Sequence, residues 1–215
     1  MINKDLIKRI ITALILLPFV VFILLSSKKL FILLLIVVLI LSTYEWFGLN
    51  KNRVSIISLA GFLIILTSIS FSYFLRGNDY ESIIVFLWIV FVCFFSDTGG
   101  YVMGRIIKGR KIIKISPNKT YAGMYGSLVF SIFPILIFHF FKVDVLFLNF
   151  KTIILSLSFS LVCQLGDITV SYFKRKNRVK DTGNLLPGHG GLLDRVDGLI
   201  FVIIFSGILK VYEVI

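Results

Sequence analysis

Long apolar runs alternate with short polar segments along the whole of this chain. Each run has close to the ~20 residues that a helix needs to cross about 30 Å of hydrocarbon. The runs cover residues 6–27, 29–48, 54–75, 81–105, 121–141, 152–174 and 194–214. Because open strands cannot satisfy their backbone hydrogen bonds in lipid, each run is predicted to be a helix. The pattern predicts an all-α, polytopic transmembrane helix bundle of about seven spans, in which the first two are separated most narrowly, at residues 26–29.

The composition agrees with a bilayer as the solvent. Of the 215 residues, 58% are hydrophobic, and the mean hydropathy is +0.98. An ordinary soluble domain is about 45–50% apolar, and a core of this size cannot hide the excess. We expect a single integral membrane domain over residues 1–215, with N-terminal helices in 1–80 and the helices and loops of the candidate site in 81–215.

The basic residues predict the orientation. The net charge is +12, but the lysines and arginines lie between the spans, which is typical of cytoplasmic loops rather than of a nucleic-acid surface. With the N-terminus inside, 17 of the 23 basic residues fall inside and 6 outside, so the chain is predicted to be N-in and C-out. The first run has no small-residue cleavage site and is expected to be a retained helix.

Two loops, at residues 106–120 and 175–193, fall on the inside and are rich in Gly, Pro, Lys and Arg. Loops placed by a rigid scaffold often carry function, so both are predicted to be functional. Cys93 and Cys163 lie within apolar runs, without Cys or His neighbours at zinc spacing, so neither a disulfide framework nor a zinc site is expected.

Acidic residues gather at one predicted depth, near the cytoplasmic ends of the helices. They are Glu45, Asp97, Asp167, Asp194 and Asp197. Charged groups within membrane helices are costly and indicate a function. Carboxylates at one level favour a divalent cation such as Mg²⁺, which binds one or two carboxylates together with substrate phosphate and water. Ion pairing remains the alternative, for example between Asp97 and Arg105 or between Asp194 and a loop lysine.

Spacing places several of these polar residues on shared helix faces. Gln164, Asp167 and Ser171 stand at i, i+3 and i+7, and Asp194 and Asp197 are three residues apart.

The loop before the last helix contains Gly188, Gly190 and Gly191 around His189. Glycines let the backbone approach a ligand closely, and amides before a helix N-terminus form an anion site. With Lys174, Arg175, Lys180 and Arg195 flanking it, the loop is predicted to bind a polyphosphate, although any tight turn can be glycine-rich. His189 is expected to contact phosphate rather than metal, and His139 to be structural.

Two further segments carry signals. Gly100 and Gly104 form a small-xxx-small pair, which favours close helix packing and is compatible with a ligand role for Asp97. Ser116 and Pro117 are typical of a helix cap followed by a first-turn proline, which would place Lys119 and Thr120 in a first turn facing the cytoplasm.

These residues together resemble the signature of the phosphatidate cytidylyltransferases, also called CDP-diacylglycerol synthases. The matching positions are Ser171, Lys174, Arg175, Lys180, Asp181, Gly183, Pro187, His189, Gly190, Gly191, Asp194, Arg195 and Asp197. The segments 97–105, 115–120 and 164–167 look like the other blocks of that family, in the same order. The resemblance covers residues 90–200, and the first three spans resemble the family only in hydropathy.

Two positions depart from the family pattern. Ala122 and Val170 stand where the family usually has acidic residues, which puts secondary metal ligation in doubt. The chain is also shorter than bacterial members, which commonly carry additional N-terminal helices.

The resemblance implies that CTP and phosphatidic acid react to CDP-diacylglycerol and pyrophosphate, with Mg²⁺ and room for a second cation. It implies Asp167 and Asp194 as leading metal ligands, then Asp97, with Asp197 and Lys180 also catalytic. Phosphate-binding roles fall to Ser116, Lys119, Thr120, Ser171, Lys174, Arg175, His189, Gly190, Gly191 and Arg195. The partners are CTP, phosphatidic acid and the bilayer of a bacterial inner membrane; nucleic acid is not expected, and a homodimer stays open.

Other functions remain as alternatives. A second CTP-dependent lipid transferase, such as a polyprenol or phytol kinase, would share a basic, Mg²⁺-dependent cytoplasmic site. A small transporter would carry polar residues through the full depth of the bundle. An inactive homologue is compatible with Ala122 and Val170.

Overall fold

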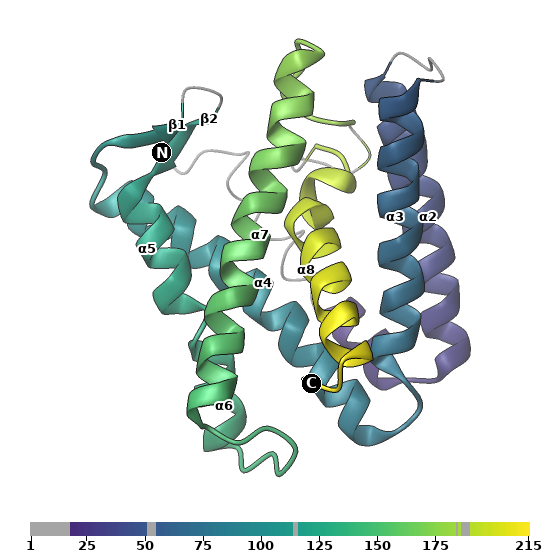
Figure 1. The fold of residues 1–215 in the computed structure, drawn as a ribbon, viewed down its shortest axis with the longest axis vertical. Helices are drawn as coiled ribbons and strands as arrows, with labels where there is room; N and C mark the ends of the chain where they lie inside the picture. Colours follow the sequence, from purple (N-terminus) through teal and green to yellow (C-terminus); the bar gives the residue numbers. More distant parts are fainter. Residues whose placement is uncertain (1–17, 51–54, 114–115, 184, 186–189) are drawn as a thin grey trace.

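The computed structural model of this chain describes residues 18–50, 55–113, 116–183, 185 and 190–215. The chain is a helix bundle with one short β-hairpin (Figure 1). Residues 18–25 are helical. The helices that follow are α2 (Lys28–Leu49), α3 (Ile56–Arg76), α4 (Tyr80–Ile106), α5 (Tyr121–Phe130), α6 (Phe133–Phe140), α7 (Phe150–Lys176) and α8 (Leu193–Val211). The antiparallel hairpin of β1 (Lys111–Ile113) and β2 (Ser116–Thr120) lies between α4 and α5.

Five stretches are long and apolar enough to cross a membrane: α2, α3, α4, α5 with α6, and α7. They coincide with five of the seven predicted runs. The first predicted run lies mostly outside the described residues. The seventh corresponds to α8, which is 19 residues long and has Asp194, Arg195 and Asp197 near its start, so its apolar part is shorter. The polytopic helix bundle is thus confirmed, apart from the short β-hairpin, which the sequence did not predict, whereas the count of seven spans stays a prediction.

The first two predicted spans are separate within the described residues. The helix of residues 18–25 ends before Ser26, and α2 begins at Lys28. Ser27 caps α2, because its side-chain oxygen accepts a hydrogen bond from the Leu30 amide at 3.4 Å. A serine cap of this kind satisfies one of the unpaired amides at a helix start.

The fifth predicted run is two helices rather than one, since α5 ends at Phe130 and α6 begins at Phe133. Pro134 lies in the first turn of α6. A proline has no amide hydrogen and clashes with the carbonyl four residues earlier, which here belongs to Phe130. The break in the helix therefore follows from Pro134.

Helix α4 crosses the bundle behind α7 and α8 (Figure 1) and packs against α3, α5, α6, α7 and α8. Its residues Trp88, Ile89 and Val92 are buried against Phe159 of α7 and Val202 of α8. The main core therefore centres on α4, which carries Asp97 toward one end.

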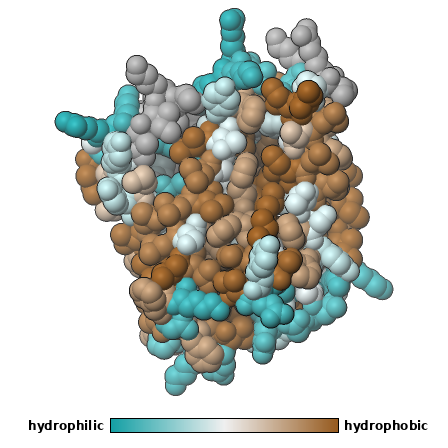
Figure 2. Space-filling model, in the orientation of Figure 1, coloured by the Kyte–Doolittle hydropathy of each residue, from teal (hydrophilic) through white to brown (hydrophobic). Residues whose placement is uncertain are grey.

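Large apolar side chains also cover the outside of the bundle. Ile40 is 60% exposed, Leu63 58% and Phe140 80%. Figure 2 shows a broad hydrophobic band with hydrophilic residues at its two ends. Such a continuous apolar surface would be unfavourable in water and is the surface expected in lipid, so this is an integral membrane protein.

The crossing of α4 and α5 depends on glycines. A Cβ atom on Gly99 would lie 2.6 Å from the carbonyl oxygen of Gly126, and one on Gly100 would lie 2.5 Å from Oγ of Ser127. A Cβ atom on Gly104 would come within 3.2 Å of Thr120 Oγ1. Small residues let the helix backbones approach closely. The predicted packing role of Gly100 and Gly104 is confirmed, and it brings the start of α5 against the end of α4.

Because successive helices alternate in direction, one end of the bundle collects the ends that carry polar residues. The last turn of α2, the last turns of α4 and α7, the hairpin and the start of α8 lie toward the top of Figure 1. The loops after α3 and α6 and the C-terminus lie toward the bottom. The candidate site residues therefore belong to the upper end.

Candidate active site

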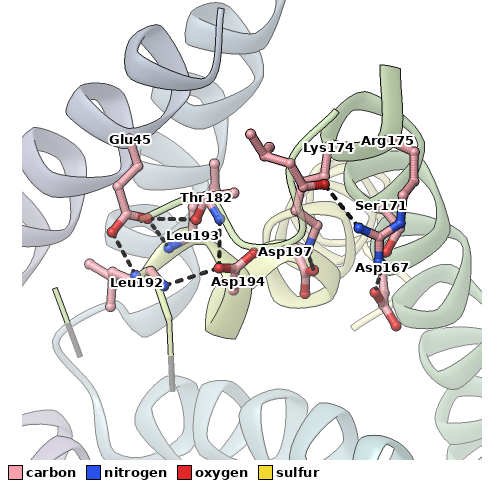
Figure 3. Close-up of polar contacts among 12 residues, drawn as sticks. Glu45, Asp167, Ser171, Lys174, Arg175, Thr182, Leu192, Leu193, Asp194 and Asp197 are labelled. Atoms are coloured by element: carbon pink, nitrogen blue, oxygen red, sulfur yellow. Dashed lines mark hydrogen bonds and ion pairs between the residues drawn. The ribbon is translucent and has the colours of Figure 1, made fainter. Parts of the chain in front are cut away.

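The five acids that the sequence placed at one depth come from α2, α4, α7 and α8. Figure 3 shows four of them: Asp194 and Asp197 at the start of α8 lie between Glu45 of α2 and Asp167 of α7. The five fall into two groups. Hydrogen bonds join Glu45 and Asp194 to the segment before α8. Asp97 of α4 and Asp167 of α7 form the second group with Asp197 of α8, on which the charges of both act.

Both carboxylate oxygens of Asp194 already accept hydrogen bonds from this protein. Its Oδ1 accepts from Lys174 Nζ at 2.7 Å, and its Oδ2 accepts from the amides of Thr182 at 2.8 Å and Gly191 at 3.0 Å. Its side chain is 5% exposed. The alternative of an ion pair is therefore confirmed for Asp194. Its partner, Lys174, lies at the end of α7, whereas a lysine of the loop was expected. A metal at Asp194 would have to displace these donors.

Glu45 is the second acid of this group. Its carboxylate accepts three hydrogen bonds, from the Thr182 hydroxyl and from the amides of Leu192 and Leu193. Sequence reasoning placed Glu45 at the correct level, but nothing in the sequence marked Thr182 as its partner.

Asp167, in α7, is paired with a lysine from the hairpin. Lys119 Nζ lies 2.5 Å from Oδ2 of Asp167, and the Ser171 hydroxyl donates to Oδ1 at 3.3 Å. The shared helix face of Asp167 and Ser171 is therefore confirmed, while Gln164 points its amide to Ser160 at 3.3 Å. The Asp167 side chain is 35% exposed, so one side of this ion pair remains open to a ligand.

Asp97 is exposed although it lies within α4. Its Oδ1 accepts a hydrogen bond from Cys163 Sγ on α7 at 3.6 Å, and Asp167 and Lys119 are among the charged groups that act on it. The alternative ion pair with Arg105 is not among the contacts of these two described residues, since Arg105 donates to the Tyr101 hydroxyl at 2.9 Å. Cys163 is a site neighbour that the sequence did not single out; it stands four residues before Asp167, on the same helix face.

Asp197 is the buried member of this group. It is 7% exposed, and its Oδ1 accepts from the Gly198 amide at 2.8 Å. Its Oδ2 lies 4.0 Å from Lys174 Nζ, so Lys174 connects the two groups of acids. A buried lysine shared by two aspartates neutralises much of their charge.

The remaining basic residues differ in what they can offer a phosphate. Lys174 is buried and engaged by Asp194, whereas Arg175, Lys180 and Arg195 are exposed. Arg175 also donates to the Val179 carbonyl at 2.9 Å and so shapes the turn after α7. The exposed bases therefore suit phosphate binding better than Lys174 does.

The glycine loop is described only in part. Gly190 has φ 83°, a conformation that favours glycine, and the Gly191 amide is used by Asp194. His189 lies outside the described residues. The predicted helix start at Ser116 and Pro117 is wrong, because residues 116–120 form β2. Thr120 caps α5 instead, since its hydroxyl accepts from the Gly123 amide at 3.1 Å, so Lys119 and Thr120 precede the helix rather than lie in its first turn.

The donor set fits a hard divalent cation at Asp97 and Asp167. Both are carboxylates open to solvent, and Mg²⁺ commonly takes one or two carboxylates and completes its shell with phosphate and water. Within the described part of the chain, no three His, Cys, Asp or Glu side chains form a cluster that could hold a metal alone. The protein would therefore supply a partial shell, which a polyphosphate would complete.

The chain is similar in sequence to known cytidylyltransferases. The model of the family described as "Cytidylyltransferase family" matches residues 50–212. The phosphatidate cytidylyltransferase of Staphylococcus haemolyticus (strain JCSC1435) is 40% identical over 169 residues, which cover 76% of this chain and 63% of that protein. The phosphatidate cytidylyltransferase of Staphylococcus aureus (strain COL) is 38% identical over 169 residues, with the same shares. This chain thus spans 63% of the length of these relatives. Since the family model matches most of its length, the chain belongs to the cytidylyltransferase family.

Proposed function

We propose that this protein transfers a cytidylyl group from CTP to phosphatidic acid, giving CDP-diacylglycerol and pyrophosphate. The observation that carries the proposal is the group of Asp97, Asp167 and Lys119 at one end of a membrane-embedded bundle. A phosphate-binding group at that level can meet a lipid headgroup from the side and a nucleotide from the water. Family membership and the names of the relatives point to the same reaction.

The reaction exchanges one phosphorus–oxygen bond for another. A phosphate oxygen of the lipid attacks the α-phosphorus of CTP, and the bond from that phosphorus to the bridging oxygen breaks, so pyrophosphate leaves with the electron pair. The attacking oxygen is already anionic, so no Ser-His-Asp arrangement is required. Catalysis then rests on positioning and on neutralising charge.

The residues would divide these tasks by position. Asp97 and Asp167 would hold a divalent cation, which when bound supplies charge neutralisation on the phosphates. Lys119 would turn from Asp167 to a phosphate, and the exposed Arg175, Lys180 and Arg195 would hold the rest of the polyphosphate. Lys174 would stay with Asp194 and Asp197, because removing it would leave buried carboxylates without a counter-charge.

We further propose that the site faces the cytoplasm of a bacterial cell across its inner membrane. The site end carries the hairpin and the α7–α8 segment, where the basic residues are most frequent. Cytoplasmic segments of membrane proteins have this bias, and CTP is a cytoplasmic nucleotide. The orientation is therefore N-in and C-out.

A single assay separates the proposal from its main alternative. The purified protein in lipid nanodiscs is given labelled CTP, Mg²⁺ and either phosphatidic acid or a polyprenol. The expected product is CDP-diacylglycerol, formed only with phosphatidic acid and together with one equivalent of pyrophosphate. A lipid monophosphate formed with CDP from the polyprenol would instead identify a CTP-dependent kinase.

A further inference from the structure

The carboxylate of Glu45 is buried and hydrogen-bonded to the segment before α8. It lies in the last turns of α2 and is 2% exposed. Its Oε2 accepts from the Thr182 hydroxyl at 2.9 Å and from the Leu193 amide at 2.8 Å, and its Oε1 accepts from the Leu192 amide at 2.8 Å (Figure 3). One carboxylate of α2 therefore joins Thr182 to Leu192, which are ten residues apart in sequence, and both lie far from Glu45 along the chain.

Two of these donors are amides at the start of α8. The first amides of a helix have no partner within the helix and carry its positive dipole end. Leu192, the N-cap residue, has an apolar side chain that cannot accept them. Glu45 thus caps α8 from another helix, and the three bonds offset the cost of burying its charge.

The glycines of this segment fit the Glu45 side chain. A Cβ atom on Gly191 would lie 2.4 Å from Oε2 of Glu45, and one on Gly183 would lie 2.9 Å from Oε1. Both distances are too short for any larger residue. At these two positions, glycine lets the backbone close around the carboxylate, which is a reason for the glycines that is independent of phosphate.

The same segment is held from its other side by Asp194. The Thr182 amide donates to Asp194 while the Thr182 hydroxyl donates to Glu45. Helix α2 is itself fixed nearby, because Trp46 Nε1 donates to the Ser58 carbonyl of α3 at 2.9 Å and its ring packs on Phe173 of α7 at 5.4 Å. Glu45 therefore links the end of α2, which packs against α3 and α7, to the segment of the candidate site.

We infer that Glu45 is a positioning residue that holds Thr182 and the start of α8 at Leu192 and Leu193, so that Asp194, Arg195 and Asp197 face the site. Glu45 lies before residues 50–212, which match the family model. In the proposed function it touches no substrate and acts only through the loop. The activity part of the inference rests on the proposed function, whereas the structural part does not.

The test compares Glu45→Gln with the control Glu81→Gln in the full-length protein. Glutamine keeps the volume of Glu45, but its NH₂ group would face backbone or hydroxyl donors in place of one accepting oxygen. Glu81 is an exposed acid in the first turn of α4, at the opposite end of the bundle. Both variants are purified in the same detergent and checked for a single, monodisperse species.

Limited trypsin digestion is the first readout, because Arg178 and Lys180 are exposed just before the fastened segment. Cleavage after these residues is expected to be at least about tenfold faster in Glu45→Gln, since the segment loses bonds to a charged acceptor and opens more often. Glu81→Gln should be cleaved at the wild-type rate. An unchanged rate in Glu45→Gln would overturn the inference.

Activity is the second readout. Glu45→Gln should lower kcat/KM for CTP about tenfold or more, because misplaced binding groups are costly, and Glu45→Asp should recover part of it. A fall in activity with wild-type proteolysis would show that Glu45 acts other than through the loop, and would also overturn the inference. If the wild type makes no CDP-diacylglycerol, the proposed function fails while the proteolysis comparison still decides the role of Glu45.

Thr182→Val covers the case in which Glu45→Gln does not fold. Valine keeps the shape of Thr182 and removes only the hydroxyl that donates to Glu45. We expect Thr182→Val to raise the cleavage rate less, by about threefold. The double variant Thr182→Val/Glu45→Asp should be cleaved no faster than the faster of the two single variants. Additive effects of the two changes would place the residues in separate networks and contradict the inference.

Discussion

Lys119 at the end of the hairpin and Asp167 in α7 form an ion pair of 2.5 Å that joins the hairpin to α7. The pair is partly exposed on both sides, with side-chain exposures of 23% and 35%. An exposed ion pair contributes little to stability. We therefore propose that the pair serves ligand binding, in which a cation would replace the lysine at Asp167 and the lysine would bind a phosphate.

The first prediction follows from this pair. Asp167→Asn should reduce cytidylyl transfer roughly a thousandfold or more, as expected for the loss of a ligand that positions a cation. The melting temperature should change little, because Asn keeps the volume and the Ser171 contact. Transfer rates over a Mg²⁺ titration, together with thermal stability in detergent, provide the measurement. Near-normal rates at all Mg²⁺ concentrations would make Asp167 a structural residue.

Asp194→Asn is expected to act differently. Removing this charge leaves Lys174 buried beside only Asp197, and breaking a buried pair costs about 3–5 kcal/mol. We therefore predict a lower melting temperature as well as loss of transfer. Lys174→Met in the Asp194→Asn background should restore part of the stability, because it removes the uncompensated charge. A fully stable Asp194→Asn protein with altered Mg²⁺ dependence would instead favour direct metal ligation, as the resemblance implied.

Lys180 tests the role of the exposed bases. Its side chain is exposed on the α7–α8 segment, so Lys180→Ala should leave stability unchanged. The KM for CTP should rise about tenfold, as for the loss of one charge-assisted phosphate contact. Steady-state kinetics with varied CTP provide the check. If the variant has wild-type kinetics, Lys180 contributes only to the orientation of the protein in the membrane.

The glycine crossing of α4 and α5 gives a prediction about stability alone. Gly99→Ala should destabilise the protein by about 1–3 kcal/mol, because its Cβ would meet the Gly126 carbonyl and the Phe130 side chain. Gly48→Ala in α2 is the matched control, since a Cβ atom there has nothing within 4 Å. Melting curves of the two variants measure the difference, and equal melting temperatures would contradict the close packing described here.

The proposed orientation is tested at the two ends of the bundle. Ile215 and the candidate site lie at opposite ends (Figure 1). A reporter fused after Ile215 should therefore show an extracytoplasmic location, while a cysteine at position 180 should be protected from an impermeant reagent in intact cells. A cytoplasmic reporter signal would require an even number of spans.

Much of the fold could be predicted from hydropathy because lipid imposes one rule. Every backbone polar group in the hydrocarbon must be bonded within its own segment, so an apolar run of about twenty residues forms a helix whatever its neighbours are. The runs of α2, α3, α4 and α7 were placed within a few residues for this reason. The break between α5 and α6 could also have been predicted, because Pro134 is visible in the sequence and stops a helix by its own geometry.

The depth of the acids was likewise determined by the sequence alone, since the position of a residue along a spanning helix sets its level in the membrane. Which acid meets which partner was decided only by the tertiary structure. Glu45 and Leu193 are 148 residues apart in the chain, and Asp194 meets Lys174 rather than a loop lysine. Such pairs depend on how each helix is rotated and how closely it approaches its neighbour, and glycine contacts such as those of Gly99 and Gly191 set that approach. The rotation of each helix and its distance from its neighbours arise from the packing of all helices together. They therefore cannot be predicted from the sequence pattern of a single segment.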